Sequence, residues 1–289
     1  MTSLSLLQCG KRELDLSTPV VMGILNITPD SFSDGGQFYT KSYLDLGTVM
    51  DKADRMLKDG AKILDVGGES TRPGAKPVTV AEEMDRVLPV IERLVALDAV
   101  ISLDSSSPEV ISEAVKLGIG IINDVRALRK EGALAVAAES GLPVCLMHMQ
   151  GDTPQTMQLD PSYQSVVDEV KDFLILQVER CLTAGVAKKN ILIDPGFGFG
   201  KNLRHNLTLL NRLDQLVALG YPLLSGTSRK SMLGLISGKP ADQRLVSSVA
   251  SALLAAQKGA AILRVHDVAE TVEALNIWKA TCNESWECN

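Results

Sequence analysis

Short apolar runs, each ending in a polar residue and a turn, recur along the whole chain. The clearest is Ile191–Ile193, which runs into Asp194 and then into a turn with three alternate glycines that ends at Lys201. Runs of this length, rich in β-branched residues, are typical of strands buried on both faces. The pattern predicts strands at 20–27, 62–66, 99–104, 119–124, 143–147, 191–194, 222–225 and 260–266.

Between these runs, apolar residues recur at helical spacing. The pattern predicts helices at 42–59, 79–95, 108–118, 131–140, 162–183, 206–219, 242–258 and 267–280, with a further helix starting after 226–231. Three of the starts have capping residues: Thr79 with Glu82, Ser107 before a proline, and Asp267 with Glu270.

Strict alternation of strands and helices implies a parallel sheet, and eight such units imply an α/β fold of the closed (β/α)8 TIM barrel type. An open, doubly wound sheet is the alternative. Residues 4–16 predict a short N-terminal β-hairpin that acts as a lid or plug. We expect one domain over 1–289, with a disordered tail at 282–289. The loops after the strands are polar and glycine-rich, so we expect the active face there.

Composition excludes several classes of protein. The length of 289 residues and the 45% hydrophobic content suit one large barrel, and the net charge of −6 argues against binding to nucleic acid. No run approaches the ~20 apolar residues of a membrane span, and the run before Cys9 is too short for a lipidated leader. The five cysteines form no Cys-x-x-Cys pair, which favours reduced thiols and a cytoplasmic location. The three histidines have no neighbouring cysteines, so we expect no zinc site.

Polar side chains gather at the predicted strand ends, which a barrel brings to one rim. Each alone has an ordinary structural interpretation, such as a turn or a helix cap. Together they are hard to explain in that way, because a buried polar group without a partner costs about 1–3 kcal/mol. The set is Asn26, Asp65, Asp104, Asn123, His148, Asp194, Lys230 and His266, with Arg72 and Arg264 close by.

The charges in this set divide into two groups. Asp104, Asn123 and Asp194 suit a flat heterocycle with N–H and amino groups along one edge. The cations, together with the helix start after 226–231, favour an anion. The residues therefore predict a polar heterocycle attached to an anionic leaving group. The glycine-rich stretch 196–201 has neither dinucleotide-loop nor P-loop spacing, and no nucleophile is evident.

Several longer motifs resemble those of bacterial dihydropteroate synthases. Met22–Gly36 and Asp65–Gly74 are similar to the two signatures of that family, and the likeness covers about 15–280 in family order. One departure lies in 102–106, where Leu103 and Ser105 flank Asp104 in place of the more usual Val and Thr, and we expect only a packing change. Further matches are at 146–151, 194–201, 228–231 and 264–266.

The resemblance implies a (β/α)8 barrel that joins 4-aminobenzoate to 6-hydroxymethyl-7,8-dihydropterin diphosphate and releases pyrophosphate. It implies inhibition by sulfonamides, a requirement for Mg²⁺ and a homodimer formed through late helices. The loops at 28–36 and 67–74 would close over the site. By motif, the pterin would contact Asp104, Asn123, Asp194 and Lys230. The diphosphate would contact Thr71, Arg264 and His266, and Mg²⁺ would bind Asn26. The aminobenzoate site would include Arg72, Phe199, Lys230 and Ser231. Lys230, Arg264 and His266 would be catalytic.

Two other functions remain open from the sequence. A pterin-barrel methyltransferase would share the pterin-binding acids but would need no cations for a diphosphate. A non-catalytic pterin-binding paralogue would show broken motifs, and none is broken. Arg264 and His266 lie two residues apart, so both side chains point to the same face of the strand. Inside a barrel Arg264 needs a partner, which is either the bound diphosphate or a barrel aspartate.

Overall fold

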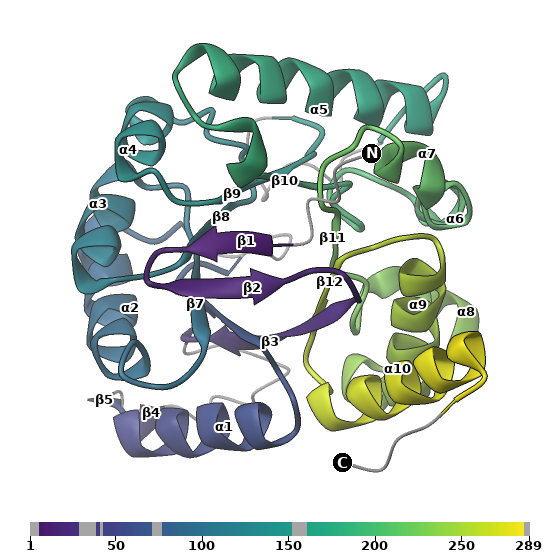
Figure 1. Ribbon diagram of the computed structural model, residues 1–289, viewed down its shortest axis with the longest axis horizontal. Coiled ribbons are helices and arrows are strands. Elements are labelled where there is room, and N and C mark those ends of the chain that lie inside the picture. The colour runs from purple at the N-terminus through teal and green to yellow at the C-terminus, as the bar shows by residue number, and fades with distance from the viewer. Residues whose placement is uncertain (1–5, 29–38, 41–42, 71–76, 152–160, 286–289) are drawn as a thin grey trace.

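The chain folds into a barrel of parallel strands surrounded by helices (Figure 1). The computed structural model describes residues 6–28, 39–40, 43–70, 77–151 and 161–285. The barrel strands are β3 (Val20–Asn26), β6 (Ile63–Gly67), β7 (Val100–Asp104), β8 (Ile121–Asp124), β9 (Val144–Met147), β10 (Ile191–Asp194), β11 (Leu224–Ser225) and β12 (Ile262–Val265).

The eight-stranded sheet runs in the order β10-β9-β8-β7-β6-β3-β12-β11, and every neighbouring pair is parallel. A single parallel bridge between Ile193 and Leu223 joins the two end strands. The sheet is therefore a nearly closed barrel, which confirms the predicted fold and excludes the open sheet. The predicted N-terminal hairpin is also present as β1 (Leu6–Cys9) paired antiparallel with β2 (Arg12–Asp15). A small second hairpin pairs β4 (Tyr39–Thr40) with β5 (Tyr43–Leu44).

The helices follow the strands in the predicted order. They are α1 (Leu46–Lys58), α2 (Val80–Leu94), α3 (Pro108–Leu117), α4 (Ala133–Ser140), α5 (Val166–Thr183), α6 (Leu203–Asn211), α7 (Leu213–Val217), α8 (Ser231–Ser237), α9 (Leu245–Gln257) and α10 (Val268–Asn283), with short 3-10 turns at Lys188–Asn190 and Ala241–Gln243.

Several details of the helix prediction were wrong. The single helix expected at 206–219 is two helices that meet at Arg212, and the first helix begins at Leu46 rather than at residue 42. The last helix continues to Asn283, so the expected tail cannot begin at 282. The capping box at Thr79 is present, but Ser107 and Asp267 precede their helices without capping them through their side chains.

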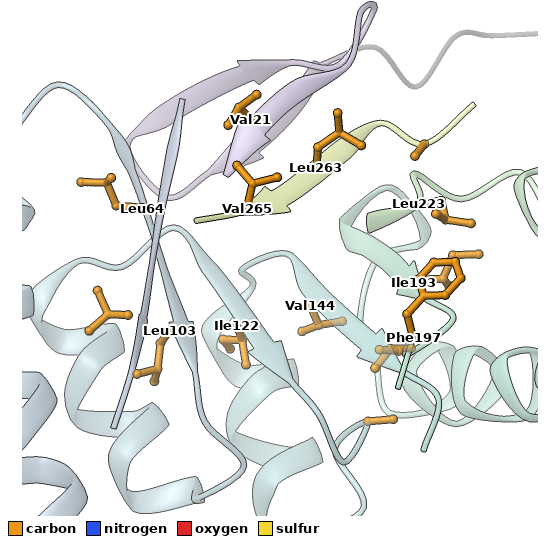
Figure 2. Close-up of a cluster of buried hydrophobic side chains, with 14 of the residues drawn as sticks. Val21, Leu64, Leu103, Ile122, Val144, Ile193, Phe197, Leu223, Leu263 and Val265 are labelled. Carbon is orange, nitrogen blue, oxygen red and sulfur yellow. The ribbon is translucent and has the colours of Figure 1, made fainter. Parts of the chain in front are cut away.

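Alternate strand residues face outward and pack under the helices. Figure 2 shows this layer, with Leu64, Leu103, Ile122, Val144 and Leu263 each contributed by a different strand. Burying such side chains is worth about 1.5–3 kcal/mol each, so this layer supplies much of the force that closes the barrel.

The inward-facing residues form two layers of opposite character. Near the amino ends of the strands the interior is apolar and includes Ile63, Ile121, Leu192 and Ile262. The β1–β2 hairpin packs into this layer through Leu7, Cys9 and Leu14, and Figure 1 shows it lying across the middle of the ring of helices.

Two residues further along the strands, the inward positions become polar. They carry Asp65, Ser102, Asn123, Asp194 and Arg264, of which the first four are buried and the last is half-buried. The strand period of two residues thus places apolar and polar side chains on the same interior face at different heights. Any ligand in the barrel must lie on this polar layer, because the apolar layer and the hairpin fill the other end.

Two other features bear on the environment of the chain. No helix in the described part is both long and apolar enough to cross a membrane. Cys9, Cys145 and Cys181 are buried free thiols, and Cys282 is an exposed free thiol. Cys288 lies outside the described residues.

Candidate active site

Arg264 joins two carboxylates across the polar layer. Its Nε donates to Asp65 Oδ2 at 2.6 Å, and its Nη2 donates to Asp104 Oδ2 at 2.8 Å. Asn123 Nδ2 lies 3.4 Å from both carboxylate oxygens of Asp65, a longer contact. Strands β6, β7, β8 and β12 thus meet in one polar cluster. Of the two partners considered for Arg264, the barrel aspartates are present in the structure, and the contact with a diphosphate stays a prediction.

Asp104 and Asp194 have unusual proton affinities for carboxyl groups. Burial raises the pKa of Asp104 to about 7, although the nearby Arg264 opposes that shift. Burial likewise raises the pKa of Asp194 to about 6, against a hydrogen bond of 2.7 Å from the Gly196 backbone N–H. Both groups can therefore change ionisation near neutral pH, as functional-site carboxyls often do.

Lys230 and Phe199 form one wall beside Asp194. The Lys230 Nζ lies 4.2 Å from the centroid of the Phe199 ring, within cation–π distance. Burial and the nearby Arg264 lower the pKa of Lys230 to about 8. Phe199 is buried with Val125, Met147 and Met149. A methyl group on Gly198 would lie 3.2 Å from Lys230 Cδ, so the glycine leaves room for the lysine stem.

His266 is held by Ser228 at the end of β12. The Ser228 Oγ accepts the His266 backbone N–H at 3.2 Å and lies 3.0 Å from His266 Nδ1. Since an oxygen that already accepts an N–H can donate its own proton to Nδ1, this arrangement favours the ring proton on Nε2. Burial and the neighbouring Arg229 hold the pKa of His266 well below its ordinary value.

The Asp267 carboxylate accepts hydrogen bonds from Arg229, which is distant in sequence, and does not cap its own helix. Arg229 donates to its carboxylate through Nη2 at 2.5 Å and Nε at 3.2 Å. Arg229 itself has a left-handed backbone with φ of 57°. This ion pair explains why Asp267 does not cap α10, and it fixes the loop that carries Ser228 and Lys230.

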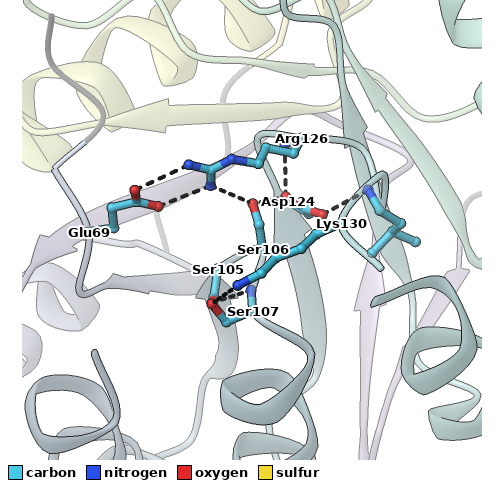
Figure 3. A network of polar contacts seen from close by, with 8 residues as sticks. Glu69, Ser105, Ser106, Ser107, Asp124, Arg126 and Lys130 are labelled. Atoms are coloured by element: carbon cyan, nitrogen blue, oxygen red, sulfur yellow. Dashed lines mark hydrogen bonds and ion pairs between the residues drawn. The ribbon is translucent and has the colours of Figure 1, made fainter. Parts of the chain in front are cut away.

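A second polar network lies beside the first, at the ends of β6, β7 and β8 (Figure 3). Arg126 Nη1 and Nη2 donate to the two carboxylate oxygens of Glu69 at 3.0 and 3.2 Å, and Nη1 also donates to Ser106 Oγ. The Ser106 hydroxyl donates in turn to Asp124. Lys130 donates to Ser107 Oγ at 2.9 Å, which explains why that serine does not cap α3. Through Glu69, the network anchors the first part of the predicted loop at 67–74.

The glycine-rich stretch after β10 is folded around a buried lysine. Lys201 Nζ donates to the carbonyl oxygens of Gly196 and Phe199, both at 2.9 Å, and lies 2.8 Å from His148 Nδ1. Because the lysine points into the protein, this stretch cannot use it to bind phosphate, which supports discounting a nucleotide loop. His148 is buried and lies beneath the loop.

Comparison with known proteins identifies the family. The family model described as "Pterin binding enzyme" matches residues 22–266. A dihydropteroate synthase of Haemophilus influenzae is 50% identical over 278 residues, which is 96% of this chain and 99% of that protein. That of Escherichia coli is 54% identical over 269 residues, or 93% of each chain. This chain belongs to the dihydropteroate synthase family of pterin-binding enzymes.

Solved structures of the dihydropteroate synthase family have the same fold. The Yersinia pestis enzyme in a sulfonamide drug complex gives a TM-score of 0.92 at 51% identity, covering 96% of this chain and 99% of that one. The Xanthomonas albilineans enzyme in complex with 7,8-dihydropteroate gives 0.86 at 46% identity, covering 96% and 98%. The predicted family and barrel are both confirmed.

The described part of this dihydropteroate synthase family member brings most of the predicted residues to one rim. Asn26, half-buried, ends β3, and Ser231, exposed, begins α8. Thr71 and Arg72 lie outside the described residues, as do most of the loops predicted to close the site. At the sequence departure, Leu103 packs in the outer core and Ser105 Oγ accepts the Ser107 backbone N–H at 3.1 Å.

Sequence reasoning missed four residues of this region: Glu69, Arg126, Lys201 and Ser228. Glu69, Lys201 and Ser228 stand inside motifs that the sequence analysis quoted, but their partners are remote in sequence. The partner of Glu69 is 57 residues away, and that of Ser228 is 38 residues away. Only the position of these residues next to polar strand ends could have drawn attention to them.

Proposed function

We propose that this protein is a dihydropteroate synthase. It condenses 6-hydroxymethyl-7,8-dihydropterin diphosphate with 4-aminobenzoate and releases pyrophosphate. The observation that carries this proposal is the layer of buried acids and amides inside the barrel, with cations at its upper edge, in a chain about half identical to dihydropteroate synthases. Such a layer binds a heterocycle through its N–H groups and an attached diphosphate through the cations.

The pterin lies on the polar layer. Above pH ~6 the Asp194 carboxylate is ionised and accepts two N–H groups from the aminopyrimidine edge. Asn123 and Asp104 bind the rest of the polar edge, and Lys230 supports the ring from the Phe199 side. The pterin competes with Arg264 for the Asp104 carboxylate. When the pterin is bound, Arg264 keeps its contact with Asp65, and the other N–H groups of the guanidinium are directed toward the diphosphate.

The departing diphosphate is bound by the Arg264 cation and by neutral hydrogen-bond donors. Arg264 and His266 lie at the end of β12 and, with Thr71, stabilise the negative charge that develops as the C–O bond breaks. The neutral arylamine of 4-aminobenzoate then attacks the methylene carbon. No strong base is required, since the amine can lose its proton after attack. Phe199, Lys230, Arg72 and Ser231 form the aminobenzoate site.

Magnesium suits the residues at the top of β3. The described part of the chain has no cluster of three or more acidic, histidine or cysteine ligands. Mg²⁺ commonly uses only one or two protein ligands and completes its shell with substrate phosphates and water. A Cβ atom added to Gly67 would lie 3.7 Å from Asn26 Oδ1 and 3.7 Å from Asp104 Oδ2. Because glycine has no Cβ, it leaves space beside the amide oxygen of Asn26. Asn26 would hold the ion, which would help to neutralise the diphosphate.

We also propose a homodimer in the cytoplasm. Large apolar side chains are exposed on three late helices that pack together: α8 carries Leu235 and Ile236, α9 carries Val246 and Leu254, and α10 carries Ile277. Exposed apolar groups gathered in this way favour association. The buried free thiols are compatible with a reducing compartment.

The test of function is direct. Purified protein with both substrates and Mg²⁺ should form 7,8-dihydropteroate and pyrophosphate in equal amounts, and sulfonamides should compete with 4-aminobenzoate. Absence of product from folded protein would refute the proposal. Arg264→Ala should weaken binding of the pterin diphosphate much more than binding of the bare hydroxymethyl-pterin. Equal weakening of both would limit Arg264 to its contacts with Asp65 and Asp104.

A further inference from the structure

Lys201 has an unusual position for a lysine, because it is almost wholly enclosed at 3% exposure. Its Nζ has three close acceptors: the carbonyl oxygens of Gly196 and Phe199 at 2.9 Å and His148 Nδ1 at 2.8 Å. Two of these belong to the loop after β10, and the third follows β9. Burying an amine is costly unless hydrogen bonds compensate for the lost hydration. The buried lysine therefore favours the loop conformation in which these three acceptors surround its Nζ.

The loop bound by Lys201 has further supports on either side of Phe199. The Gly198 backbone N–H donates to the buried Asn206 Oδ1 at 2.7 Å, and the Gly200 carbonyl accepts from the Tyr163 hydroxyl at 2.8 Å. The carbonyl of Phe199 lies between these two supports and is bound by Lys201. The Phe199 backbone is thus held at its carbonyl by Lys201 and at its N–H by the Gly196 carbonyl, which accepts at 3.1 Å, and Lys201 binds both carbonyls of this turn.

The Phe199 ring, in turn, carries the cation–π contact with Lys230. We propose that Lys201 is a positioning residue for the aminobenzoate site, which it shapes by fixing the backbone turn that aims Phe199 at Lys230. This inference rests on the function proposed above. Lys201 does not touch substrate, and it acts through Phe199. Its effect should therefore fall on 4-aminobenzoate more than on the pterin, because Asp194 belongs to β10 itself and keeps its place.

The experiment compares Lys201→Met with Lys189→Met, which makes the same substitution at an exposed position. A second control, Leu14→Ala, weakens the buried hairpin at the opposite end of the barrel. For Lys201→Met we expect the KM for 4-aminobenzoate to rise about tenfold or more, the scale on which small misplacements act. The KM for the pterin diphosphate should change little. Both controls should leave the two KM values near those of the wild type.

A spectroscopic measurement gives a signature that loss of stability alone does not. The chain has three histidines, so the ring nitrogen signals of His148 can be assigned by comparison with His148→Gln. In Lys201→Met the His148 signals should move, because Nδ1 loses its partner, while in Leu14→Ala they should stay. If Lys201→Met does not fold, Lys201→Arg is measured, and its larger head should also raise the KM for 4-aminobenzoate.

The outcomes separate this inference from the proposed function. A wild-type protein without synthase activity removes the function on which the inference rests. An active wild type, with a folded Lys201 variant whose KM for 4-aminobenzoate is unchanged, overturns the role of Lys201 alone. A rise shared equally by both substrates, or matched by Leu14→Ala, also overturns it, because the effect would then be general destabilisation.

Discussion

Removing Arg264 should destabilise the protein in a way that depends on pH. The guanidinium donates to Asp65 at 2.6 Å and to Asp104 at 2.8 Å, and the Asp65 side chain has no exposed surface. Two charged hydrogen bonds of about 1.5–3 kcal/mol each would be lost. Breaking one side of a buried ion pair costs about 3–5 kcal/mol in total, because the remaining charge is left without compensation. We expect Arg264→Ala to lose about that much at pH 8.

The pH dependence follows from Asp104. Its folded pKa is about 7 with Arg264 opposing the effect of burial, and loss of the arginine raises that pKa further. The pKa of the unfolded aspartate is about 3.9, so between these values the folded variant binds more protons than the unfolded chain. Stability of the variant therefore falls as pH rises through this window, and the deficit relative to wild type should be smaller at pH 5.5 than at pH 8.

Urea unfolding followed by circular dichroism at both pH values measures the effect. Lys258→Ala is the control, because it removes an exposed partner of Asp214 at 3.8 Å and should cost less than about 1 kcal/mol. A loss in Arg264→Ala as small as that of the control would refute the view that this arginine neutralises buried acids. A larger loss without any pH dependence would show that Asp104 does not take up the proton.

Asp194→Asn should cost about 2–4 kcal/mol in pterin diphosphate binding, measured by calorimetry, since a buried charged pairing is broken; unchanged affinity would contradict the assignment. If the loops at 28–36 and 67–74 close around the first ligand, 4-aminobenzoate should bind poorly to the free protein and better with pyrophosphate and Mg²⁺, and equal affinity would argue against ordered closure. Gly196→Ala should prevent correct folding or cost several kcal/mol in thermal unfolding, because φ is 66° and the new carbon would lie 1.9 Å from a carbonyl oxygen; normal stability would refute this. Val246→Asp should shift a dimer to monomer in analytical ultracentrifugation, and a variant that remains dimeric would place the interface elsewhere.

The sequence predicted the barrel and most of its rim because both depend on short-range patterns. An apolar run ending in a polar residue identifies a buried strand and the end at which its chemistry lies. Asp194 and Asn123 could therefore be assigned to the mouth without knowing any partner. The two-residue period also placed Arg264 correctly on the inner face.

The remaining features depend on partners that are distant along the chain. Arg264 meets Asp65 across 199 positions, so no local pattern could decide between a protein partner and a ligand. Asp267 looks like a helix cap, but Arg229 on a neighbouring loop takes its carboxylate. Side-chain direction in a loop is equally hard to predict from the sequence, and the Lys201 side chain points inward.

The hairpin of β1 and β2 has a consequence for molecular traffic through the barrel. With Leu7, Cys9 and Leu14 packed against the apolar layer, the barrel is a blind well rather than a passage. Reactants and products must use the same opening, and whatever lies deepest must arrive first and depart last. Slow release of a product through the single opening would then delay binding of the next substrate, even if the chemical step were fast.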